Sequence, residues 1–130
     1  MAVAVVDAHH HLIDTHRLAY PWIEEPRAAL TALLPNYYDI AHDYDVGSYS
    51  ADVGSERPAA TVACEFGAGD GLAEARYVQR CADELGWPSA FIAAVDLTSP
   101  KLEQTLAAYQ ELPIVRAVRQ PLYWANDTLR

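Results

Sequence analysis

Four short apolar runs along the chain predict β-strands. They occupy residues 3–13, 61–66, 91–97 and 114–120. The first three show little of the apolar–polar alternation that is typical of a strand with one solvent-exposed face. This pattern favours buried strands of a parallel sheet. The first run is expected to be buried on both faces and ends abruptly in Asp7 and three histidines.

Two amphipathic helices are predicted between the later strands. In residues 72–86, Asp70 is suited to cap the first turn and Gly86 to end the helix. In the second helix, Ser99 and Pro100 supply an N-cap and a first-turn proline, and Pro113 stops the element. The apolar stripes of the two helices contain Leu72, Ala75, Val78, Cys81, Ala82 and Leu85, and then Leu102, Leu106, Tyr109 and Leu112.

A long segment separates the first two strands. The prolines and aromatic residues of residues 12–27 predict an ordered loop rather than a helix. Residues 27–34 suggest one helical turn, and residues 37–49 a short exposed helix followed by a loop. Residues 67–71 are glycine-rich but lack the lysine of a phosphate-binding loop, so they predict a strand-to-helix turn.

The order of elements predicts an α/β fold with about four parallel strands. Strands that alternate with helices of this length form right-handed βαβ units. The 130 residues suffice for one domain with a core, here residues 1–130. The fold is then either an open four-stranded sheet or the N-terminal half of a (β/α)₈ barrel, which takes about 250 residues. A half barrel would expose strand edges and an apolar face, which favours a homo-oligomer.

The composition and charge indicate which classes of partner and which cellular compartment to expect. A net charge of −9 argues against nucleic acid and anionic membrane surfaces as partners. Residues 1–6 lack the basic start of a signal peptide, and no window reaches the roughly 18 apolar residues of a membrane helix. Cys64 and Cys81 are expected to be buried free thiols. Together these features predict a cytoplasmic protein.

The first strand carries the candidate chemistry. Strand alternation places Asp7, His9 and His11 on one face and His10 on the other. Two imidazoles on one face at the carboxyl end of a strand form a possible pair of metal ligands, in the position where α/β sheets and barrels hold their active sites. The alternative is a polar strand end without a ligand. A tag remnant is disfavoured because the three histidines continue the strand without a linker.

Other candidate residues lie at the ends of later strands or in the first loop. Arg119 is placed to hold a substrate carboxylate, or else to pair with a neighbouring acid. Glu65 and Asp7 are expected to support the site by orienting other groups. Trp22 either contacts substrate or covers the end of the sheet as an apolar plug.

With these residues the sequence resembles the amidohydrolase superfamily, in particular the lactonase-like branch called amidohydrolase family 2. The resemblance rests on Val-Val-Asp-Ala-His-His-His-Leu at residues 5–12 and on the Tyr-Pro-Trp at residues 20–22. It continues in residues 62–65 and 115–120. It implies a (β/α)₈ barrel, of which this chain would supply the N-terminal half. The family often has a histidine where this chain has Gln120.

The resemblance also implies an activity. His9 and His11 would be the catalytic and metal-binding pair, with zinc or a similar divalent ion, although some lactonases of the branch work without metal. The expected reaction is attack of water on the carbonyl of a sugar-acid or dicarboxylate lactone, a small-molecule substrate. One alternative is a metal-dependent decarboxylase on the same fold. The other is a truncated barrel without activity, because the later-strand histidines and the aspartate of the family would lie beyond Arg130.

Overall fold

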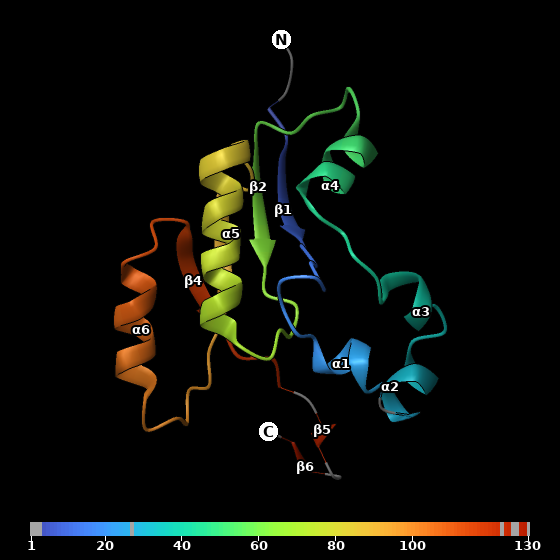
Figure 1. Cartoon of the computed structure of the whole chain (residues 1–130), viewed down its shortest axis with the longest axis vertical. Helices are drawn as coiled ribbons and strands as arrows, with labels where there is room; N and C mark the ends of the chain where they lie inside the picture. Colours follow the sequence, from blue (N-terminus) through green and yellow to red (C-terminus); the bar gives the residue numbers. More distant parts are fainter. Residues whose placement is uncertain (1–3, 27, 123, 126–127, 130) are drawn as a thin grey trace.

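In the computed structural model, four parallel strands form one sheet whose spatial order follows the chain order (Figure 1). The structure describes residues 4–26, 28–122, 124–125 and 128–129. The strands are β1 (Val6–His10), β2 (Ala60–Cys64), β3 (Ala90–Ala94) and β4 (Val115–Arg119). All three strand pairs are parallel. The predicted α/β class with four parallel strands is therefore confirmed.

Two helices connect the later strands. They are α5 (Gly71–Leu85), between β2 and β3, and α6 (Leu102–Gln110), between β3 and β4. The two helices contact each other, and α5 also packs on β3 (Figure 1). A short antiparallel pair, β5 (Trp124–Ala125) and β6 (Thr128–Leu129), follows β4.

The segment between β1 and β2 holds four short helices. They are α1 (Pro21–Glu24), α2 (Ala28–Leu33), α3 (Tyr37–Ile40) and α4 (Val46–Val53). The predicted turn over residues 27–34 and the short helix after residue 37 are confirmed, whereas the loop predicted up to residue 49 is wrong from Val46, where α4 begins. The loop predicted over residues 12–27 is wrong at α1, where Pro21 occupies the first turn and needs no N–H partner. Val3 and Arg27, which belong to predicted elements, lie outside the described residues.

The core lies between the sheet and α5. Phe91 and Ala93 of β3 are buried together with Val78 of α5 and Tyr109 of α6. The Tyr109 hydroxyl donates a hydrogen bond of 2.6 Å to the carbonyl of Ala94, so the buried ring keeps its polar atom satisfied. Cys64 and Cys81 are both buried free thiols, as predicted. None of the described helices is long and apolar enough to cross a membrane.

The ends of α5 confirm the sequence prediction, whereas α6 begins later than predicted. The Asp70 carboxylate accepts hydrogen bonds from the N–H groups of Leu72 and Ala73. Gly86 ends α5 with a left-handed φ of 73°, which costs glycine little. Helix α6 starts at Leu102 because residues 99–101 form a preceding turn, so Ser99 is not its cap.

Strand β1 differs from its prediction in burial. It lies at one end of the sheet and pairs with β2 only. None of its residues is fully buried, and the side chains of Val5 and Val6 are 58% and 55% exposed. The apolar run was wrongly expected to be buried on both faces, because an apolar run does not reveal whether a strand has neighbours on both sides.

Candidate functional site

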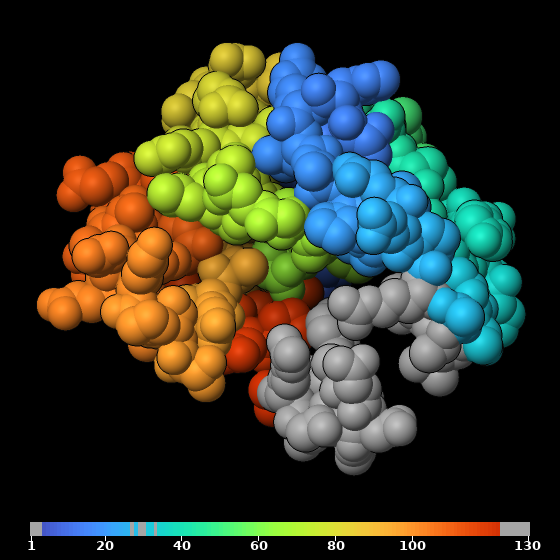
Figure 2. Space-filling view, turned by 60° about the horizontal axis from the view of Figure 1, so that its bottom comes forward, coloured from blue at the N-terminus to red at the C-terminus, as the bar shows by residue number. Residues whose placement is uncertain are grey.

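The candidate residues meet where the parallel strands end. His9 and His10 close β1, Glu65 follows β2, and Arg119 closes β4. Because parallel strands end at the same edge, these side chains gather there despite wide separation in sequence. Figure 2 looks toward this end of the molecule, where the segment after β1 and the start of α5 lie beside each other.

His9 and His11 share one face, as predicted. Their Nε2 atoms lie 3.2 Å apart, and the ring planes are nearly perpendicular at 84°. The Nδ1–H of His11 donates to the carbonyl of Cys64 at 3.0 Å. Because a carbonyl only accepts, this bond leaves a lone pair on Nε2 of His11. The imidazole of His11 therefore presents the atom that a metal ion or a donor would bind.

The Cys64 thiol adds a third hydrogen-bond contact, which links Cys64, His9 and His11 in one network. Its Sγ lies 3.6 Å from Nδ1 of His9, and burial raises the pKa of this thiol, which keeps its proton. The thiol can therefore donate to Nδ1 of His9, and Nε2–H of His9 then donates to Nε2 of His11. Burial also lowers the pKa of His11, which favours its neutral form.

The geometry of the pair fits two ligands of one metal ion. Two imidazole nitrogens bound to a tetrahedral zinc ion at about 2.0–2.1 Å lie about 3.3 Å apart. The observed separation is 3.2 Å. Among the residues that the structure describes, no group of three or more histidine, cysteine, aspartate or glutamate side chains is placed to hold a metal ion. The described part of the chain thus offers two ligands of a site.

Asp7 does not share the face of the histidine pair. Its pairing with β2 shifts by one residue between Asp7 and His10, which indicates a β-bulge. The Asp7 carboxylate accepts a 2.7 Å hydrogen bond from the Tyr49 hydroxyl, and this bond is the main cause of its lowered pKa. His10 stacks on the same Tyr49 ring. The predicted placement of Asp7 was wrong because a bulge breaks the two-residue alternation.

Glu65 and Arg119 form a partly buried ion pair. The Arg119 Nε donates to the Glu65 carboxylate at 2.6 Å, and Nη2 donates to the Glu65 carbonyl at 2.8 Å. The Glu65 side chain is only 3% exposed, and that of Arg119 is 33% exposed. Of the two alternatives left open by the sequence, the structure contains the pairing with a neighbouring acid. A substrate contact by Arg119 stays a prediction.

Trp22 holds the loop that follows β2. Its indole N–H donates to the carbonyl of Phe66 at 2.7 Å, and its ring meets the Phe66 ring edge-on. The Tyr37 hydroxyl donates to the carbonyl of Trp22. These contacts fit the alternative in which Trp22 closes the end of the sheet. A direct substrate contact by Trp22 is untested.

Phe66 is a site residue that the sequence did not reveal. Its ring stacks on His11 with centroids 4.0 Å apart and planes 18° from parallel. The only signal was its place directly after Glu65, at the end of an apolar run. Through this contact the loop held by Trp22 fixes the orientation of the His11 ring.

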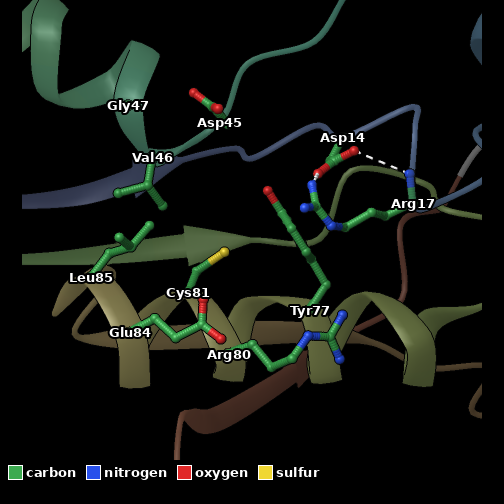
Figure 3. Close-up of a pocket in the computed structure, with 10 residues that line it drawn as sticks. All are labelled: Asp14, Arg17, Asp45, Val46, Gly47, Tyr77, Arg80, Cys81, Glu84 and Leu85. Atoms are coloured by element: carbon green, nitrogen blue, oxygen red, sulfur yellow. Dashed lines mark hydrogen bonds and ion pairs between the residues drawn. The ribbon is translucent and has the colours of Figure 1, made fainter.

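A hollow of about 220 Å³ lies away from these residues, between α5 and the start of α4 (Figure 3). Asp14 and Arg17 form an ion pair there, and Tyr77 extends toward them from α5. Asp14 also accepts hydrogen bonds from the N–H groups of His16 and Arg17. These interactions fix the turn after β1, and none of the predicted site residues lines this hollow.

Glu74 is a buried acid that lies close enough to the Glu65–Arg119 ion pair to interact with its charges. It is 1% exposed, and its Oε1 accepts a 3.0 Å hydrogen bond from the N–H of Phe66, whereas Oε2 has no partner among the residues that the structure describes. Burial raises the pKa of Glu74 to about 7, and the charge of Glu65 adds to this shift. Glu74 is therefore largely protonated in mildly acidic solution.

We expect Glu74 to make the protein less stable as the pH rises. The folded protein holds this proton up to a pKa of about 7, whereas an unfolded glutamate loses it near 4.5. The free energy of unfolding should thus fall by about 3 kcal/mol as the pH rises through this window. In Glu74→Gln this contribution is absent. Urea unfolding from pH 4 to pH 8 measures it, with exposed Glu84→Gln as the control, and equal pH profiles for Glu74→Gln and wild type would contradict the expectation.

Comparison with known proteins gives one distant relative to consider. Over 127 residues, or 96% of the chain, the sequence is 23% identical to a Sinorhizobium fredii protein described as "Uncharacterized protein y4mH". The chain spans 42% of the length of that relative. No protein-family model matches the chain, and no solved structure matches it significantly.

Proposed function

We propose that the chain forms the N-terminal half of an amidohydrolase-type (β/α)₈ barrel that hydrolyses a lactone. The observation that carries the proposal is the convergence of His9 and His11 at the carboxyl end of β1, with Nε2 atoms 3.2 Å apart. Enzymes with this barrel build their active sites from the carboxyl ends of the strands.

The strand order supports the barrel. The order β1-β2-β3-β4 has no reversal, whereas an open doubly wound sheet reverses its order at a switch point. With right-handed crossovers, strands added in one direction place their helices on the same face. The contact between α5 and α6 agrees with this arrangement. The greater length of the Sinorhizobium protein is compatible with a whole barrel.

In the proposed reaction, the histidine pair binds and orients the lactone carbonyl. A divalent ion held by His9 and His11, when bound, supplies Lewis acidity toward this carbonyl and toward water. Without an ion, the Nε2–H of His9 would turn from Nε2 of His11 to donate a hydrogen bond to the carbonyl oxygen. The carbonyl of Cys64 and the ring of Phe66 keep His11 in its orientation, which lowers the cost of positioning the group.

Lactone hydrolysis tests the proposal directly. A panel of sugar-acid and aromatic lactones is assayed with the 130-residue chain and with the longest open reading frame that contains it. We expect hydrolysis to fall at least 100-fold in His9→Ala/His11→Ala and to stay unchanged in His16→Ala, whose side chain is 86% exposed. Equal rates in the double variant and wild type would refute the proposal. Release of CO₂ from carboxylic acids without lactone opening would instead establish the decarboxylase alternative.

A further inference from the structure

A second hollow adjoins the histidine pair. It has a volume of about 390 Å³ and lies between His11 and the segment that contains α3 and α4. This volume is in the range of small-molecule sites. We call it the His11 hollow. Because His11 lines it, a molecule bound there can present a carbonyl group to the pair.

The walls of the His11 hollow are largely apolar. Ile13 is 3% exposed, and Ile40 and Phe66 also line the space. Phe66 is the ring that stacks on His11, so an occupant would touch both the apolar wall and the proposed reacting group. Such a wall favours a flat apolar ring as the occupant.

The charged groups on the hollow are acidic. Asp39 and Asp52 line it, and no lysine or arginine occurs among its described lining residues. Asp52 accepts a 2.7 Å hydrogen bond from the Tyr44 hydroxyl. Nδ1 of His42, another lining residue, donates to the carbonyl of Asp43 at 2.7 Å, which leaves Nε2 as an acceptor. The hollow therefore offers acceptors and negative charge, which repel a carboxylate.

We propose that the His11 hollow binds an uncharged, mainly apolar ring of the substrate and excludes carboxylate-bearing rings. The identification of the bound ring as part of a substrate rests on the proposed function. The inference narrows that function to one class of substrate. The dicarboxylate lactones expected from the family resemblance then become poor occupants of this hollow. An aromatic lactone with its ring on Phe66 and its carbonyl toward the histidine pair becomes the favoured one.

Binding of two matched lactones tests this choice. The probes are 3,4-dihydrocoumarin and its ring carboxylate, and their dissociation constants for the chain are measured by ligand-observed NMR. We expect the neutral lactone to bind about tenfold more tightly, because the carboxylate meets the two acids. In Asp39→Asn/Asp52→Asn the preference should fall below threefold. Both acids are exposed, so the variant is expected to fold, which circular dichroism checks.

A second variant tests the inference by filling the His11 hollow with a larger side chain. Ile40 is 42% exposed, so Ile40→Trp can occupy the space without disturbing the core and should weaken binding of the neutral lactone at least tenfold. The control is Leu97→Trp, at a residue that is 60% exposed and does not line the hollow. Equal binding of the two lactones, or unchanged binding in Ile40→Trp, would overturn the inference.

The two proposals fail in different ways. If dihydrocoumarin binds with the expected preference but is not hydrolysed, the His11 hollow stands and the lactonase proposal fails for this substrate class. If hydrolysis depends on His9 and His11 but shows no preference for the neutral ring, the lactonase proposal stands and the inference about the hollow fails.

Discussion

The affinity of the chain for Zn²⁺ is expected to fall at least 100-fold when His9 and His11 are both replaced by alanine. The two Nε2 atoms lie 3.2 Å apart, which suits two ligands of one tetrahedral ion. Each single replacement leaves one ligand and should weaken binding at least tenfold. Competition with a chromophoric zinc chelator measures the affinity, and the absorption spectrum of bound Co²⁺ reports the ligands independently of any activity.

The adjacent histidine gives a matched control. His10 stacks on Tyr49, and both of its ring nitrogens are buried without a hydrogen-bond partner in the described part of the chain, so it is not directed at the pair. His10→Ala should keep the zinc affinity within threefold of wild type, as should the exposed His16→Ala. Loss of zinc binding in these controls, or its persistence in the double variant, would show that the ion binds elsewhere.

Arg119→Met is expected to lower the free energy of unfolding by about 3–5 kcal/mol. The Glu65 side chain is 3% exposed and its carboxylate receives the Arg119 Nε at 2.6 Å. Removal of the guanidinium leaves a buried carboxylate with only the N–H of Gly67 at 2.9 Å as its remaining donor in the described structure. An uncompensated buried charge is far costlier than the loss of the pair as a whole. Urea unfolding at pH 7 measures the change.

A double variant separates the cost of losing the ion pair from the cost of leaving the Glu65 carboxylate buried without its partner. Glu65→Gln/Arg119→Met removes both charges together, so it should recover most of the stability lost in Arg119→Met. A single-variant loss below about 1 kcal/mol would show that water reaches Glu65 and that the pair behaves like a surface salt bridge. A double variant as unstable as the single one would place the loss in packing of the Arg119 side chain.

The repeating elements could be predicted from the sequence because their causes are local. The period of the apolar stripe, Asp70 before the first turn and Gly86 after the last one set α5, and all of these lie within residues 70–86. The pairing of His9 with His11 was predictable for the same reason, since side chains two residues apart on a strand share a face. The apolar runs also predicted the parallel strands.

The sequence determined which groups stand at the strand ends, and the tertiary structure decided what those groups contact. The bulge in β1 turned Asp7 toward Tyr49, because its register depends on pairing with β2. Arg119 pairs with Glu65, which lies 54 residues away in the chain, and Phe66 stacks on His11 from the loop that follows β2. The His11 hollow likewise forms only when α3 and α4 fold back beside β1. These contacts depend on the packing of distant segments, which no local pattern of residues encodes.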